Sequence, residues 1–142
     1  MTWKRLLLHA VLPIASTWAR RQERRILRAG VPLDERQLAD ARLVGIVQPE
    51  RIRLLIVDKI PPRVPLSASS TIGMALGYGI FLRRDYCGNR ALLLHELAHT
   101  AQYERLGFRG FLRRYLDECL TCGYPGGALE MEASRVAEEL CA

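Results

Sequence analysis

The sequence predicts a single α+β domain in which a small antiparallel or mixed sheet, or a hairpin, packs on a metal-binding helix. A chain of 142 residues is long enough for one domain with a core and too short for two ordinary ones. Residues 92–102 carry apolar residues at helical spacing, and residues 71–82 place large apolar side chains at even positions. The first pattern is typical of a buried helix and the second of a strand, so the core combines both.

The buried helix contains the motif His95-Glu96-x-x-His99. Two histidines four positions apart lie on one helical face, about 6 Å apart along the axis, so they can bind one ion. Glu96 lies at the margin of that face, where its carboxylate can reach a water on the ion. Catalytic zinc uses three protein ligands and a water, so the motif indicates a zinc hydrolase. The alternative is a core helix with two hydrogen-bonded histidines.

The first 28 residues carry the whole net charge. Seven basic residues and one acidic residue give 7 − 1 = +6, while the rest of the chain has 14 basic and 14 acidic residues. An apolar stripe at steps of three and four runs through the same segment, in which Pro13 should end or kink a helix. The stripe consists of Trp3, Leu7, Ala10, Ile14 and Trp18.

Residues 1–28 therefore fit a helix that docks on an anionic membrane surface or a protein partner, or one that packs on its own domain. No motif that reads bases accompanies the arginines, so no nucleic acid is expected. The basic start followed by Leu6–Ile14 resembles a signal peptide, but the arginine run continues the same helical pattern. We expect a cytoplasmic or membrane-peripheral protein rather than a secreted one.

The elements before the motif follow from breakers and periodicity. Gly30 ends the first helix, and residues 32–35 begin a second. Arg51–Val57 has the β-branched content of a strand, and the alternating segment 71–82 folds as a hairpin turning near Leu76–Gly79. Its glycines either let another backbone, such as an extended substrate, approach closely or supply a turn with φ > 0.

The helices after the hairpin have clear limits. The metal helix runs from Arg90 to Leu106, between a cap at Asn89 and a stop at Gly107. Glycines and a proline at 123–127 separate a helix over Phe108–Leu120 from a last helix over Ala128–Cys141.

Two cysteines, Cys119 and Cys122, are spaced as half of a structural zinc site or as a redox pair. No second closely spaced pair completes four ligands, and the acidic neighbours Asp117 and Glu118 should raise the thiol pKa. Reduced thiols are the default expectation for such a chain.

The histidine motif is followed downstream by Gly123-Tyr124-Pro125 and then by Glu130-x-Glu132-Ala133. With these motifs the sequence resembles the glutamate-ligated branch of the zincin metallopeptidase superfamily. It is similar to small bacterial zincin domains such as those associated with extracellular contractile injection systems. We expect one domain over residues 1–142. The likeness covers its core, residues 52–142, and residues 1–46 are expected to form a basic helical extension.

The resemblance implies that Glu130 is the third zinc ligand beside His95 and His99. It places Ser134 where relatives often have an aspartate that accepts a hydrogen bond from the N–H of a ligating imidazole. A serine hydroxyl can accept the same bond, but without the negative charge. Tyr124, six residues before Glu130, is the expected donor to the oxyanion.

Glu130 and Glu132 lie about 200° apart on the last helix, so only one can face the metal. Glu130 shares its face with the small residues Ala133 and Ser134, while Glu132 should lie at a core margin or pair with Arg135.

The function implied by the resemblance is peptide-bond hydrolysis by metal-activated water, with Glu96 as the general base and a peptide or protein as substrate. The alternative is a catalytically weak or inactive zincin-fold module that docks to a membrane or a protein partner.

Overall fold

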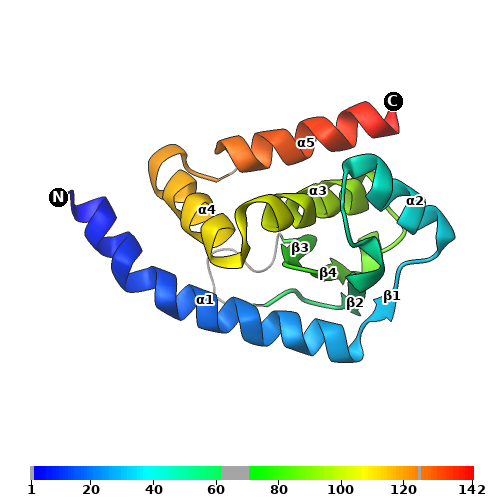
Figure 1. The fold of residues 1–142 in the computed structure, drawn as a ribbon, viewed down its shortest axis with the longest axis horizontal. Coiled ribbons are helices and arrows are strands. Elements are labelled where there is room, and N and C mark those ends of the chain that lie inside the picture. The colour runs from blue at the N-terminus through cyan, green and yellow to red at the C-terminus, as the bar shows by residue number, and fades with distance from the viewer. Residues whose placement is uncertain (1, 62–70, 125) are drawn as a thin grey trace.

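The computed structural model describes residues 2–61, 71–124 and 126–142, and within them the chain forms five α-helices and a small mixed sheet of four strands (Figure 1). The helices are α1 (Trp3–Ala29), α2 (Glu35–Val44), α3 (Arg90–Leu106), α4 (Phe108–Cys122) and α5 (Ala128–Cys141). The strands are β1 (Val31–Pro32), β2 (Arg53–Val57), β3 (Gly73–Leu76) and β4 (Gly79–Arg83), with single 3₁₀ turns at Pro49–Arg51 and Arg84–Tyr86. The predicted α+β class is confirmed.

The molecule is layered around α3. Figure 1 shows α5 on one side of this helix and the sheet on the other, with α1 beneath the sheet and α4 between α1 and α5. The largest side chains that are fully enclosed include Phe81 on β4 and Leu94 and Leu97 on α3. The core therefore lies on both sides of the sheet and beneath the histidine-bearing helix.

The helix α1 passes through Pro13 without ending. Figure 1 shows that its axis changes direction in its N-terminal half, as a missing backbone N–H and the proline ring would cause. Leu12 and Ala19 are buried on either side of Pro13, and this packing holds the two parts in one helix. In the described part of the chain, no helix is both long and apolar enough to cross a bilayer.

The N-terminal segment contributes side chains to the core through α1 and through residues 33–46. Leu12, Ala19 and Ile26 of α1 pack with residues of β4 and α4 in one buried cluster. Leu33, Ala41 and Ile46 pack with residues of the sheet and α3 in a second cluster. Of the two alternatives for residues 1–28, packing on the chain's own domain therefore holds for the inner face of α1.

The sheet has the order β1-β2-β4-β3, with β2 parallel to β4 and the other neighbours antiparallel. The predicted hairpin is present, and β3 forms one edge of the described sheet. The second helix begins at Glu35 rather than at Pro32, because Val31 and Pro32 pair with β2 and Asp34 forms a capping box with Gln37.

The hairpin turn is fastened to two helices. Gly77 has φ +65°, the left-handed region that favours glycine, and its carbonyl accepts a 2.9 Å bond from the Thr100 hydroxyl on α3. Glu23 on α1 is buried and accepts a 3.0 Å bond from the Tyr78 N–H. A turn with positive φ is one of the two roles predicted for the glycines of this segment, and Gly77 has it. The bond to Thr100 fixes the hairpin turn relative to α3.

Replacing Gly77 with alanine should lower the free energy of unfolding by about 2 kcal/mol or more, because the new Cβ meets a positive φ and the carboxylate of Glu23. Gly110→Ala inside α4 is the matched control, since its Cβ finds only an ordinary 3.8 Å contact, with Leu106 of α3. That variant should be as stable as the wild type or more so by about 0.5–1 kcal/mol. Urea denaturation measures both, and equal losses would contradict the turn's role.

Candidate metal centre

The helix α3 has the limits that the sequence predicts. The Asn89 side chain accepts from the Leu92 N–H at 3.0 Å, and the chain leaves the helix at Gly107 with φ +79°. Leu93 and Leu97 are buried against the sheet, and this packing fixes the rotation of the helix. The face that carries His95 and His99 consequently points toward α4 and α5.

Two imidazoles and one carboxylate converge between α3 and α5. Nε2 of His95 lies 2.9 Å from Oε1 of Glu130, and Nε2 of His99 lies 2.9 Å from Oε2. One potential ligand atom from each of the three residues lies within 4.8 Å of the others. The His95, His99 and Glu130 group can therefore bind a metal ion, and Glu130 rather than Glu132 is the carboxylate that the fold brings to it.

The charges of the group are strongly coupled. Burial alone would raise the pKa of Glu130, but hydrogen bonds from His95 and His99 hold it well below its usual range. Burial alone would lower the pKa of His99, but its hydrogen bond to Glu130 and the nearby carboxylates raise it to about 9. An ion that binds here must take the place of protons, so binding should release them.

Gln102 orients His99, and the sequence reasoning did not identify it. Its amide nitrogen donates to the Leu129 carbonyl at 3.0 Å and to Glu132 at 2.8 Å, so its Oε1 is left to accept from Nδ1 of His99 at 2.8 Å. Because Nδ1 keeps its proton for Gln102, Nε2 of the protonated ring donates to Glu130, and after loss of that proton its lone pair can bind a metal ion. A glutamine three residues after the second histidine, on the same helical side, was the available signal.

The two glutamates of α5 have separate partners. Glu132 lies at the core margin, as one alternative expected, and bonds to Gln102 and Arg105 of α3. A hydrogen bond from Gln102 lowers the pKa of Glu132, and the nearby charge of Arg135, the partner in the other alternative, acts in the same direction. Ser134 lies where it was expected, with Oγ 3.4 Å from Nδ1 of His95.

A tyrosine hydroxyl also reaches the cluster. The Tyr115 hydroxyl on α4 donates to Oε2 of Glu130 at 3.0 Å, and its ring packs edge-on to His99. Burial and the Glu130 charge raise the Tyr115 pKa, so it remains a neutral donor. Tyr124, the expected donor, lines the same cavity with its side chain 71% exposed, and Pro125 of its motif lies outside the described residues.

Glu96 is buried against the edge strand rather than within the ligand triangle. Its exposed fraction is 4%, and burial raises its pKa, an effect opposed by His99 and His95. A Cβ at Gly73 would lie 3.1 Å from Oε2 of Glu96. The absence of a side chain at Gly73 therefore makes the room that this carboxylate occupies.

The cluster opens into a cavity of about 360 Å³. His95, Glu96, His99 and Glu130 line one part, and the remaining walls are mainly apolar side chains of β3, α4 and the inner face of α1. Trp18 from α1, Met74 from β3 and Leu116 from α4 are among these. The site combines a few ionisable groups with an apolar chamber, which is the usual composition of a ligand pocket.

The cysteines do not join the metal-ligand group. All four are free thiols, and burial together with Glu130 and Glu118 raises the pKa of Cys119. The rise agrees in direction with the effect expected from acidic neighbours, and a thiol of raised pKa is a poor nucleophile at neutral pH.

Comparison of the chain with protein-family models, with curated proteins and with solved structures finds no match. The chemistry of the donor set is therefore the basis for assigning a function. Two imidazole nitrogens and one carboxylate fit a transition-metal ion that keeps an open position.

Glu130→Gln should lower affinity for a divalent transition-metal ion by roughly 10- to 100-fold, because the amide carries no charge and offers one oxygen. Glu132→Gln is the matched control on the same helix, and its amide oxygen can still accept from Gln102. We expect little change for it. Competitive titration with Zn²⁺ as the probe ion measures both, and the reverse ranking would move the ligand assignment to Glu132.

Proposed function

We propose that this chain is a zinc-dependent metallopeptidase of the glutamate-ligated zincin type. The observation that carries the proposal is the convergence of His95, His99 and Glu130 next to the buried carboxylate of Glu96. Each of these groups has a part in metal-assisted hydrolysis, and a core helix with two satisfied histidines would need neither a third ligand nor an adjacent carboxylate. The resemblance in the motifs supports the same assignment.

Zinc is the ion that the donor set favours. Three protein ligands of the His₂Glu type are characteristic of catalytic zinc sites, whereas structural zinc sites are closed by four ligands, usually including cysteine. His95, His99 and Glu130 would hold the ion, and Gln102 and Ser134 orient the imidazoles from behind. When bound, zinc lowers the pKa of a coordinated water and polarises a carbonyl oxygen.

Glu96 is the group that moves the proton. Burial raises its pKa above the ordinary value of a carboxyl group, which makes the carboxylate a stronger base toward a proton of water. In its ionised form it takes a proton from the attacking water and then donates it to the nitrogen of the leaving amine. A side chain at position 73 would crowd this carboxylate, so Gly73 leaves Glu96 the space in which the transfer would take place.

The cavity favours an extended peptide with an apolar side chain as substrate. The strand β3 lies at an edge of the described sheet and lines the cavity, so its backbone can pair with a peptide by strand addition. The walls formed by Met74, Leu116 and Trp18 would exclude water around the bound side chain. Tyr124 lines the same cavity and is the hydroxyl donor for the oxyanion, because the Tyr115 hydroxyl donates to Glu130.

Glu96→Gln should lower kcat by roughly 10²- to 10⁴-fold while the zinc content stays at about one ion per chain, because an amide cannot take the proton. His95→Ala and His99→Ala should lose the zinc itself. The exposed Glu139→Gln is the control for the charge change and should behave as the wild type. Peptide-library cleavage and metal analysis measure the two effects separately.

A wild-type protein that binds zinc and cleaves nothing across a diverse peptide library would replace this proposal with the alternative of a non-catalytic zincin-fold module. Unchanged zinc content in both histidine variants would reject the metal centre itself.

Gly73→Val should lower kcat on the order of 10²-fold without releasing zinc, because its side chain displaces Glu96 and leaves the ligands in place. Gly88→Val is the control, since a Cβ there meets nothing within 4 Å. Steady-state kinetics with metal analysis measure the result. A Gly73→Val enzyme of normal kcat would show that Glu96 does not depend on the space left by the missing side chain at position 73.

A further inference from the structure

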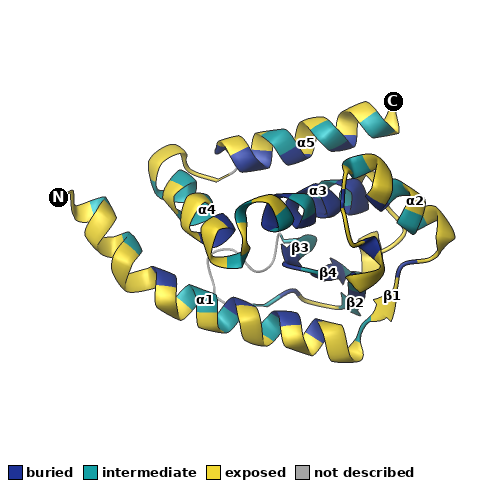
Figure 2. Cartoon of the chain, in the orientation of Figure 1, coloured by how far each residue is buried: buried dark blue, intermediate teal, exposed yellow. Residues whose placement is uncertain are grey.

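The outer face of α1 carries an exposed apolar patch that has no partner in the described part of the chain. Its residues are Trp3, Leu6, Leu7, Val11 and Ile14, of which Trp3 is 67% exposed and Ile14 73% exposed. Figure 2 shows most of α1 as exposed, although the helix packs on the domain along its other side. Large apolar side chains gathered on one surface are a mark of an interaction site.

The arrangement on the helix follows from its geometry. Leu12, Ala19 and Ile26 are buried and define the inner face. A helix turns about 100° per residue, so Trp3, Leu7 and Ile14 lie on the opposite, outer face. The same rotation places further outer-face positions in the C-terminal half of the helix, and these are arginines.

The outer face is therefore apolar in its first half and cationic in its second. Arg21, Arg24 and Arg28 are exposed on it, and Lys4 and Arg5 add charge beside the apolar patch. Glu23, the acidic residue of α1, is buried on the inner face, and its carboxylate lies 3.3 Å from the guanidinium of Arg20. No carboxylate of α1 offsets the positive charge outside.

We propose that the outer face of α1 docks on an anionic lipid bilayer. The apolar half enters the boundary between headgroups and acyl chains, and the arginines contact the anionic headgroups. Charge complementarity selects this partner, because the cationic half has no acidic counterpart on its own face. Tryptophan at the tip suits a membrane interface, where one part of the side chain is apolar and the other is wet.

A molecule docked in this way would hold the cavity of the metal centre close to the lipid surface. Ala15, Trp18 and Ala19 of the same helix line the cavity of the metal centre. The helix thus separates the membrane on one side from the candidate site on the other. The docking proposal stands on α1 alone and does not rest on the proposed hydrolysis.

Substitutions in the full chain test the proposal, because deleting α1 would also remove core residues such as Ile26. Vesicles of phosphatidylcholine alone are compared with vesicles of phosphatidylcholine and phosphatidylserine in equal amounts, by flotation. Arg24→Gln/Arg28→Gln should weaken binding to the anionic vesicles roughly 30-fold, because each basic side chain near such a surface typically contributes about tenfold or somewhat less to the affinity. Trp3→Ser/Ile14→Ser should weaken it at least about tenfold.

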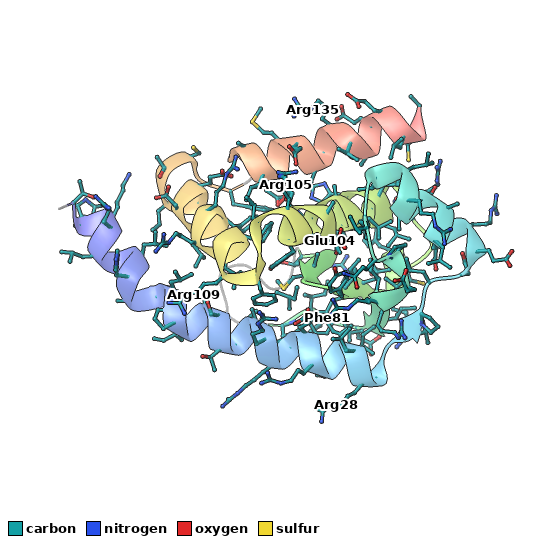
Figure 3. The ribbon with its side chains drawn as sticks, viewed as in Figure 1. Arg28, Phe81, Glu104, Arg105, Arg109 and Arg135 are labelled. Atoms are coloured by element: carbon teal, nitrogen blue, oxygen red, sulfur yellow. The ribbon has the colours of Figure 1, made fainter. Side chains whose placement is uncertain are left out.

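The matched controls lie elsewhere on the surface. Arg42→Gln/Arg135→Gln removes the same charge from α2 and α5, and Figure 3 shows Arg135 on the side of the molecule opposite Arg28. Leu43→Ser/Val47→Ser removes exposed apolar side chains from another region. Both controls should bind vesicles as the wild type does, and circular dichroism checks that every variant is folded.

Insertion has its own spectroscopic readout. The chain has two tryptophans, so Trp18→Phe leaves Trp3 as the sole one. Its emission should shift to the blue with anionic vesicles and be quenched by brominated lipid, and the shift should weaken in about 1 M salt.

Equal binding to both vesicle types, no binding, or equal loss in the controls would overturn the proposal. Self-association in sedimentation equilibrium that Trp3→Ser/Ile14→Ser abolishes would overturn it in favour of a second copy of the chain.

Discussion

The buried carboxylate of Glu130 is the constraint on which the rest of the site depends. A carboxylate with 6% exposure is tolerated only when cationic or hydrogen-bonding groups compensate it, and here two imidazoles and a tyrosine hydroxyl do so. These contacts require α5 to lie alongside α3, and the fully buried Ala133 allows that close approach. This one requirement links α3, α5 and, through Tyr115, α4 at the site.

The parts that the sequence predicts are those whose cause is local. The limits of α3 follow from a cap at Asn89 and a glycine at Gly107, and the hairpin follows from strict alternation with a glycine at the turn. The spacing of His95 and His99 places both on one face wherever the helix lies. Similarity to a motif and the small residues beside Glu130 predict it as the third ligand, and the fold brings it to the histidines.

The parts that the sequence does not predict arise from contacts between distant segments. Nothing near Tyr115 in the chain indicates that it meets His99 and Glu130, because local propensity does not determine the angle at which α4 packs on α3 and α5. Gln102 is close to His99 on α3, but its bonds to Leu129 and Glu132 depend on how α5 packs. The same holds for Glu23, whose partner Tyr78 lies 55 residues away. Nor could composition alone show that one face of the basic segment is a core surface, since the buried residues of α1 are only a few among many polar ones.

The way in which α1 contributes to the cavity has a dynamic consequence. It supplies a wall through Ala15, Trp18 and Ala19 but no ligand to the cluster, which α3 and α5 complete by themselves. In its first half only Leu12 is buried, so the free energy of local opening is lowest there. Native-state amide exchange would therefore be fastest in this half-helix, and the chamber wall at Ala15 would move with it while the ligating side chains keep their geometry.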